Sequence, residues 1–227
     1  MNKVLLATTC LFVVSGSALA SDIAVREPAS ELVVAAFTWT GGYVGAQTGY
    51  VRGDGSFGGD GDHANPKPAG FVGGLYAGAN YQFGNDVVVG IEADMAWSGA
   101  DDRALVYNSA GIPWPADYPV IQEINRTGAV RARLGYAMDR WLPYIAGGVA
   151  FAAVDQRLVG ADGNFNTTYT GWTLGLGTEY AFSDSMIFRA EYRYADLGSK
   201  TFDVQDAPPL DIALKTSDVR VGIAYKF

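Results

Sequence analysis

Cysteine is the residue that this sequence most conspicuously lacks. The one cysteine, Cys10, lies in an apolar N-terminal segment, so the remaining chain has no thiol for a disulfide, a metal site or redox chemistry. Histidine is equally scarce, because His63 is the sole example among 227 residues. Function classes that depend on cysteine chemistry are therefore excluded.

Long apolar runs are also missing. After residue 20, no stretch approaches the roughly 18 uninterrupted apolar residues that a transmembrane helix requires. Segments with a sustained 3.6-residue period are absent as well. Charged residues make up only 18% of the chain, whereas aromatic residues reach 13% and there are 29 glycines, which describes neither a disordered nor a helical protein. The class that remains is all-β.

The N-terminus has the features of a secretory signal peptide. Lys3 precedes an apolar run from Val4 to Val14, and Ala18-Leu19-Ala20 then forms an A-x-A cleavage pattern, so we expect residues 1–20 to be removed. Residues 21–38 carry mixed charges and are interpreted as a periplasmic N-terminal lead-in. The remaining residues, 39–227, form the predicted folded domain.

From Trp39 onward the side chains alternate with a period of 2, which predicts strands with one apolar and one polar face. The pattern is clearest in the last ten residues, where one parity is apolar: Val219, Val221, Ile223, Tyr225 and Phe227. It recurs in seven further segments, around 44–50, 71–83, 87–98, 130–136, 143–153, 172–182 and 186–194. In residues 143–153 both faces are small or apolar, so their parity stays open.

The connections between these segments predict the topology. Three are tight turns, at 84–86, 138–141 and 183–185, and four are long, at roughly 53–69, 99–124, 155–169 and 197–214. Short turns on one side, long loops on the other and both termini on the short side are typical of outer-membrane barrels. We therefore predict an all-β fold, an eight-stranded antiparallel up-and-down transmembrane β-barrel with four long extracellular loops and three short periplasmic turns. A soluble barrel has a similar strand number but keeps its apolar residues inside.

The charged residues distinguish these two alternatives. The polar parity of the strands carries five acids and six bases, which we predict to form a lumen charge network: Glu92, Asp94, Arg131, Arg133, Glu179, Arg189, Glu191, Arg193, Asp218, Arg220 and Lys226. Near-balance suits a narrow lumen, because each buried charge needs a partner. The four long loops instead hold thirteen acids and five bases, which equals the whole formal charge of −8. This acidity argues against a nucleic-acid partner.

Aromatic residues gather near the two ends of the predicted strands. One set lies toward the short turns: Trp39, Tyr81, Phe83, Tyr136, Trp141, Tyr180, Phe182, Tyr225 and Phe227. The other set lies toward the long loops: Tyr50, Phe71, Trp97, Trp172, Tyr192 and Tyr194. Two such belts are expected where the wall of a barrel meets the lipid headgroups.

Four sequence blocks carry a family resemblance. They are 39–45 (WTGGYVG), 130–136 with 139–144 (VRARLGY and DRWLPY), 191–198 (EYRYADLG) and the terminal strand. Together they resemble the small alphaproteobacterial outer-membrane β-barrel proteins, the porin-family or major outer-membrane immunogenic proteins, which are related to the OmpA-like transmembrane domain. The resemblance implies an eight-stranded barrel in the outer membrane of a Gram-negative bacterium, a role in envelope integrity and surface interaction and, for some members, haemin binding.

Candidate chemical sites are weak. The run 53–58 (GDGSFG) fits a dinucleotide-binding pattern, but no helix is expected after it. Asp54, Asp60 and Asp62 lack the ligand spacing of an EF-hand. Glu92 and Asp94 share a face about 7 Å apart, yet arginines on neighbouring strands favour salt bridges over an acid/base pair. We therefore predict no enzyme, no catalytic or metal-binding residue and no cofactor.

We interpret the chain as a structural, surface-exposed envelope protein whose lumen is filled by paired charges. One alternative is a small-solute porin or a haemin-binding protein, with His63, Met138, Tyr107 or Tyr118 as the axial ligand. A less favoured alternative is a lipid A-modifying enzyme that uses His63. The expected partners are outer-membrane lipid and lipopolysaccharide, the barrel-assembly machinery and a host or surface partner of the loops.

The resemblance also implies that the terminal strand, with Val219, Val221, Ile223, Tyr225 and Phe227 facing lipid, is the signal for the barrel-assembly machinery. Deleting Phe227 is therefore expected to impair assembly more than export. The assay is the heat-dependent shift in gel mobility that distinguishes folded from unfolded barrel, with the periplasmic fraction as the measure of export. Wild-type amounts of heat-modifiable protein from the deletion would contradict this role.

Overall fold

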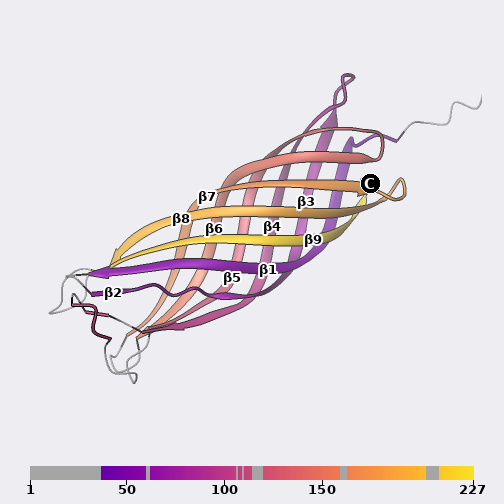
Figure 1. Cartoon of the computed structure of the whole chain (residues 1–227). Helices are drawn as coiled ribbons and strands as arrows, with labels where there is room; N and C mark the ends of the chain where they lie inside the picture. Colours follow the sequence, from indigo (N-terminus) through magenta and orange to yellow (C-terminus); the bar gives the residue numbers. More distant parts are fainter. Residues whose placement is uncertain are drawn as a thin grey trace, which may run out of the picture. The chain divides into compact units, whose positions relative to one another are not determined.

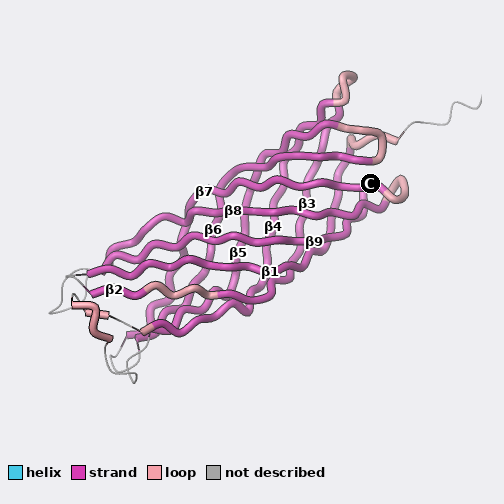
Figure 2. Tube along the Cα trace, viewed as in Figure 1, coloured by secondary structure: helices cyan, strands magenta, loops and turns pink. Residues whose placement is uncertain are grey.

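The computed structural model describes residues 37–59, 62–105, 107–108, 110–113, 120–158, 163–202 and 210–227. Strands dominate these residues (Figure 2), and they contain no helix long and apolar enough to cross a membrane. The folded unit begins at Phe37 and runs to Phe227. The expected signal peptide, 1–20, and all but the last two residues of the expected lead-in, 21–38, lie outside the described part of the chain.

The strands form one antiparallel sheet that closes on itself. Their bounds are β1 Gly41–Gly59, β2 Asp62–Ala64, β3 Ala69–Gln82, β4 Val87–Ala104, β5 Val120–Tyr136, β6 Trp141–Leu158, β7 Gly163–Ala181, β8 Met186–Phe202 and β9 Leu210–Lys226. Each long strand pairs with the next in sequence, and β9 returns to pair with β1 (Figure 1). The predicted eight-stranded barrel is confirmed, with β2 as a three-residue addition beside β1.

The seam between β1 and β9 closes the barrel. It runs from the pair Tyr43 and Lys226 to the pair Gly58 and Asp211. Beyond the Tyr43 and Lys226 pair, the backbone N–H of Phe227 donates to the Gly42 carbonyl over 2.9 Å. Backbone donors and acceptors along this seam therefore have partners, which is the condition for a sheet surrounded by hydrocarbon.

Tight turns join the strands at one end, called here the short-turn end. They connect β3 to β4, β5 to β6 and β7 to β8, as predicted, and the C-terminus lies at the same end (Figure 1). Asp86 and Asp139 occupy two of them with positive φ, at 64° and 56°. Aspartate tolerates this left-handed conformation better than most residues do. The opposite end is called the long-loop end.

The strands extend much further toward the long-loop end than predicted. Residues expected in the loops 99–124 and 197–214 include the ends of β4, β5, β8 and β9. The reason is a set of irregularities in strand pairing, between Trp97 and Ala100, between Ile124 and Arg126 and between Asp196 and Ser199. A β-bulge adds one residue to one strand, so the alternation breaks although the strands remain paired. The predicted loop boundaries at 99, 124 and 197 coincide with these bulges.

Burial alternates along the strands, and it resolves the parity of β6. Its inward side chains are Leu142, Tyr144, Ala146, Ala150, Ala152 and Val154, all buried. Trp141, Ile145 and Val149 face outward and are more than half exposed. The outward face of the barrel is apolar over the other strands too, and all five residues of the predicted assembly signal lie there with 42–74% of their surface exposed. The outward apolar surface is the one expected to meet lipid.

Trp39 does not belong to the outer aromatic belt, contrary to the prediction. It is 1% exposed and packs inside the short-turn end with Phe37, at 5.1 Å between ring centroids. Its indole N–H donates to the Asp139 carbonyl over 3.1 Å, and its backbone N–H donates to Gln82 Oε1 over 2.9 Å. The apolar residues around it are Tyr43, Tyr76, Val88, Ala137, Leu142, Ala181, Ile187 and Ala224. Residues 37–40 precede the first strand, which begins at Gly41, so the alternation predicted from Trp39 onward starts two residues too early.

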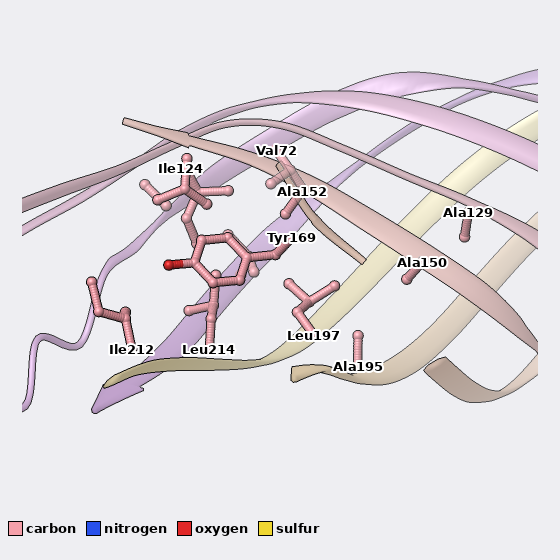
Figure 3. Close-up of a cluster of buried hydrophobic side chains, with 13 residues drawn as sticks. Val72, Ile124, Ala129, Ala150, Ala152, Tyr169, Ala195, Leu197, Ile212 and Leu214 are labelled. Carbon is pink, nitrogen blue, oxygen red and sulfur yellow. The ribbon is translucent and has the colours of Figure 1, made fainter. Parts of the chain in front are cut away.

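The interior changes character toward the long-loop end. There the barrel encloses an apolar cluster, in which the ring of Tyr169 lies among Ile124, Leu197 and Leu214 (Figure 3). The outward side chains at this end are polar instead: Arg52, Asp54, Ser56, Asp101, Arg103, Glu123, Arg126, Thr168, Thr170, Lys200 and Lys215. An apolar interior with a polar outer face is the pattern of a soluble barrel. Toward the short-turn end, the same strands have the pattern of a membrane barrel, with a charged interior and an apolar outer face. A long-loop end that projects into water explains the reversal.

Replacing Trp39 by alanine is expected to lower the free energy of unfolding by about 3–5 kcal/mol, because it leaves a cavity in a closed interior. The matched control is Trp141→Ala, which removes a 52% exposed indole that contacts Tyr180 and is expected to cost about 1 kcal/mol. Urea unfolding of the refolded protein in vesicles, followed by gel mobility, measures both. Equal losses in the two variants would show that Trp39 is not an interior plug.

Candidate functional site

The middle of the barrel holds ten charged side chains in its interior. They are Glu92 and Asp94 on β4, Arg131 and Arg133 on β5, Glu179 on β7, Arg189, Glu191 and Arg193 on β8, and Asp218 and Arg220 on β9. All ten are buried, none more than 7% exposed. Five acids face five bases, so the layer carries no net formal charge. Ten of the eleven residues predicted for the lumen network are thus brought together; the exception is Lys226.

The ten charges form one connected chain of ion pairs. At one side of the barrel, Arg220 Nε lies 2.7 Å from Asp218 Oδ1, and its Nη1 lies 3.2 Å from Asp94 Oδ1. Asp94 Oδ1 also accepts from Arg193 Nη1 over 3.0 Å. Arg193 in turn lies 3.1 Å from Glu191 Oε1. Strands that are not neighbours in the sheet are therefore tied together across the lumen.

Glu92 is the centre of the chain. Its carboxylate accepts from Arg131 Nη2 over 2.6 Å and from Arg189 Nη2 over 2.5 Å, and Arg133 Nη1 lies 3.5 Å away. The hydroxyl of Tyr43 donates to the same carboxylate over 2.8 Å. Charge-assisted hydrogen bonds of this kind are the strong ones in proteins. Three guanidinium groups therefore depend on one carboxylate for part of their neutralisation.

Arg131 and Glu179 complete the connections around Glu92. Arg131 Nη1 lies 2.8 Å from Glu191 Oε1, which joins Glu92 to the other half of the chain. Glu179 Oε1 accepts from Arg189 Nη2 over 2.6 Å. It also lies 2.9 Å from Arg133 Nη2, although that contact lacks the alignment of a hydrogen bond.

Tyrosines from the strands without interior charges complete this layer. The Tyr43 hydroxyl accepts from Arg133 Nη1 while it donates to Glu92, and the Tyr144 hydroxyl donates to Glu191 over 2.7 Å. The guanidinium carbon of Arg133 lies 4.1 Å from the centre of the Tyr144 ring. Cation–π contacts of this kind strengthen when the cation is desolvated. Each of the eight long strands therefore contributes a side chain to the layer, since Tyr76 on β3 lies 4.1 Å beneath Arg189.

Each of the three tyrosines lies opposite a glycine on the neighbouring strand. The register pairs are Tyr43 with Gly78, Tyr76 with Gly45, and Tyr144 with Gly177. A Cβ at Gly45 would lie 2.5 Å from the Tyr76 ring, so the absence of a side chain is what admits the ring. These tyrosines and glycines were not predicted as parts of the network. The sequence could have indicated them, because these tyrosines and glycines occupy the same inward-facing parity as the charged residues.

Lys226 shares the inward parity but takes no part in the ion pairs. It lies at the short-turn end, six residues beyond Arg220, which is about 20 Å along the strand. Its ammonium group lies 5.6 Å from the centre of the Phe37 ring. Inward parity alone therefore did not show how far along the barrel axis Lys226 lies. The chain of ion pairs has no net formal charge without Lys226.

The arrangement does not suit acid/base catalysis. Glu92 and Asp94 are both held by arginines and are 2% and 7% exposed. A catalytic carboxylate needs access to a substrate, and these groups have none in the space that the described side chains fill. The chemistry that the network performs is mutual neutralisation of buried charge.

The glycine-rich run 53–58 is part of β1 rather than a phosphate-binding loop. The backbone N–H groups of Gly53 and Gly55 donate to the carbonyls of Pro68 and Pro66, over 2.7 and 2.8 Å. They are therefore not available to a phosphate. Asp54 faces outward, and Asp60 lies outside the described residues. Within the part of the chain that is described, no group of three or more potential ligands could hold a metal ion.

His63 and Tyr107 lie together at the long-loop end. Their backbones exchange two hydrogen bonds of 2.8 Å, and their rings stack with centroids 5.8 Å apart. Met138 lies in a tight turn at the short-turn end, so it cannot share a ligand with them. Tyr118 lies outside the described residues. No hydrogen bond from a described side chain orients the His63 ring, as an acid would in a catalytic triad.

Replacing Glu92 by glutamine is expected to cost about 3–5 kcal/mol of unfolding free energy, because three buried arginines lose a shared counter-charge. The control is Asp184→Asn, which breaks the exposed ion pair with Arg140, in which the Asp184 side chain is 82% exposed. That change is expected to cost less than about 1 kcal/mol. Urea unfolding in vesicles measures both, and a small loss for Glu92→Gln would show that the network does not hold the barrel together.

Comparison with known proteins identifies the family to which this barrel belongs. The family model described as outer membrane protein beta-barrel domain matches residues 6–227. The chain is 34% identical to the 31 kDa outer-membrane immunogenic protein of Brucella melitensis, and the match covers all of both chains. It is 31% identical to a 22 kDa outer membrane protein of Rhizobium leguminosarum bv. viciae, and that match covers 84% of this chain and 79% of the relative. Among solved structures, OprG from Pseudomonas aeruginosa shares the fold, with a TM-score of 0.59 at 14% identity over 84% of this chain and 98% of OprG.

The relatives are named as outer-membrane proteins, and the closed sheet with its apolar outer wall is that of an outer-membrane barrel. The short-turn end is accordingly periplasmic and the long-loop end extracellular. This chain belongs to the outer membrane protein beta-barrel domain family and resides in the outer membrane of a Gram-negative bacterium.

Proposed function

We propose that this protein is a non-enzymatic structural barrel that contributes to envelope integrity and presents its extracellular end for surface interactions. The observation that carries the proposal is the filled interior. From the periplasm outward, it consists of the plug around Trp39, the layer of ten paired charges and the apolar cluster around Tyr169. Each layer obstructs the lumen for a different physical reason.

All three layers hinder the passage of ions through the lumen. The plug and the apolar cluster offer few ligands to a hydrated ion, which would have to shed water to enter. The charged layer offers ligands, but its carboxylates are already held by guanidinium groups at 2.5–3.2 Å. An eight-stranded barrel has an interior just wide enough for side chains to fill. A small-solute porin is therefore the less favoured function.

The extracellular end is the part that would meet other molecules. Its described surface carries acids and bases in equal number: Asp54, Asp101, Asp102, Glu123, Asp155 and Asp196 against Arg52, Lys67, Arg103, Arg126, Lys200 and Lys215. Most of the acidic excess of the sequence therefore belongs to the remaining loop residues, among them Asp60, Asp117, Asp162, Asp203 and Asp206. A basic or cation-bridged host or surface partner suits loop tips of this charge. The Brucella relatives are named as immunogenic proteins.

Assembly of the barrel is the second expected interaction. β9 presents Val219, Val221 and Ile223 outward and pairs with β1 along the closing seam. Until that seam forms, β9 is an exposed amphipathic edge strand. This property supports the barrel-assembly machinery as the partner that receives it.

Cells that lack this protein are expected to become sensitive to detergent and to leak periplasmic enzymes, while their uptake of small hydrophilic solutes stays unchanged. The purified protein is expected to give no stable porin-like current in planar bilayers, because its interior is occupied. Leakage assays and solute-uptake rates in the deletion strain test the first part, and single-channel recording tests the second.

Complementation supplies the control. A gene carrying Glu123→Gln, a change of one outward carboxylate at the extracellular end, should restore the envelope as fully as the wild-type gene does. Stable channels of porin-like conductance, or a deletion strain whose only defect is slower solute uptake, would replace the structural function by a porin.

A further inference from the structure

Two arginines on the outer wall lie at the level of the extracellular aromatic belt. Arg52 on β1 follows Tyr50 by two residues, and Arg126 on β5 is the register partner of Trp97 on β4. Both side chains are exposed, and neither makes an ion pair or a side-chain hydrogen bond with a described residue. Each is thus a free cation at the border between the apolar wall and the polar extracellular end.

The neighbours of Arg52 leave its guanidinium room to bind a ligand. Its register partners are small on both sides, Ala69 on β3 and Ser217 on β9. Below it, Tyr50 and Phe71 pack edge to face with centroids 5.4 Å apart. Belt aromatics lie at the depth of lipid headgroups, so the guanidinium reaches the headgroups from an apolar base.

The surroundings of Arg126 repeat this design on another part of the wall. Trp97 lies opposite it on β4, and Ala153 lies opposite it on β6. The bulge in β4 leaves Gly99 exposed beside it, and a Cβ at Gly99 would meet nothing within 4 Å. A cation with an aromatic neighbour and open, small-residue surroundings therefore occurs twice.

Two lysines of the extracellular end are already engaged by the protein, whereas the side chains of Lys67 and Arg103, nearer the tips, are held by no described residue. Lys215 pairs with Asp196 at 3.7 Å, and Lys200 Nζ donates to the Thr168 carbonyl over 2.8 Å. Arg52 and Arg126 lack such contacts, although Asp54 follows Arg52 by two residues and Glu123 precedes Arg126 by three. The protein holds these two arginines in the wall without neutralising them.

We propose that Arg52 and Arg126 bind phosphate groups of the outer-leaflet lipid, and thereby fix individual phosphorylated lipid molecules to the barrel. A guanidinium group presents paired N–H donors that match phosphate oxygens, and each desolvated pair gains both charge and hydrogen-bond energy. The aromatic base favours a lipid over a free anion, because the acyl chains of that lipid can lie against the wall below. Phosphate binding at these sites is independent of whether the lumen conducts.

The test is lipid binding by the folded barrel in detergent, with bound molecules counted by native mass spectrometry. Wild type, Arg52→Gln/Arg126→Gln and Lys67→Gln/Arg103→Gln are titrated with phosphorylated lipid A, with dephosphorylated lipid A and with inorganic phosphate. The control pair removes the same charge from two exposed side chains nearer the extracellular tips, which also lack ion pairs. Gel mobility before and after heating verifies that all three proteins are folded.

Wild type is expected to retain phosphorylated lipid A, and the Arg52→Gln/Arg126→Gln variant to bind it roughly 10- to 30-fold more weakly. The control variant should bind it nearly as well as wild type. Dephosphorylated lipid A should bind wild type no better than it binds the arginine variant, and inorganic phosphate should not bind at the same concentration. Equal binding of phosphorylated lipid A by wild type and the arginine variant would overturn the proposal, and so would an equal loss in the control variant. Binding of dephosphorylated lipid A by wild type as tight as that of phosphorylated lipid A would also overturn it.

Discussion

Pairing of guanidinium and carboxylate groups across the lumen is the interaction on which the rest of this barrel depends. A closed sheet that faces hydrocarbon must place its polar residues inside, and a lumen of eight strands is too narrow to hydrate them. Unpaired, each charge would cost several kcal/mol. The five acids and five bases are instead linked into one chain through Glu92, Glu191 and Asp94, so the same groups that burial penalises connect strands on opposite sides of the barrel. The tyrosine and glycine pairs follow from this, because the arginines need both ring faces and space.

Polarity then varies with height along the same strands. Around the ion pairs, the wall is apolar and the interior charged; above them, the wall is polar and the interior apolar, as Val51 inside and Arg52 outside illustrate on consecutive residues of β1. The outward change coincides with the belt formed by Tyr50, Phe71 and Trp97, where the surroundings pass from lipid to water. The bulges in β4, β5 and β8 lie in the same zone. They adjust which residues point inward where the two patterns meet.

The sequence was sufficient for the features that depend on alternation. Period 2 predicted the strands, the parity of Glu92 or Arg131 predicted an interior place, and the near-equality of charges predicted pairing. Three kinds of feature were predicted wrongly. The bulges break the period while pairing continues, so strand ends such as Ala104 and Val120 were taken for loop. Trp39 was assigned to the outer belt by its place in the sequence alone, although it lies two residues before the first strand and points inward. Lys226 has the right parity, but its place between Tyr225 and Phe227 puts it about 20 Å from Arg220 along the strand, a height that parity alone does not give.

In a barrel filled in this way, the residues that determine stability differ from the residues that the loops expose. The ion pairs and the closing seam lie within the described strands, and the plug lies at the short-turn end. None of the three involves a residue at the tips of the extracellular loops. Changes at those tips therefore leave the layers that hold the strands together intact, because buried contacts and exposed loops that share no partners affect stability nearly independently. The apolar cluster around Tyr169 adds a second core between the loops and the ion pairs. An envelope protein with this construction can vary what it presents outside the cell while keeping the wall that anchors it.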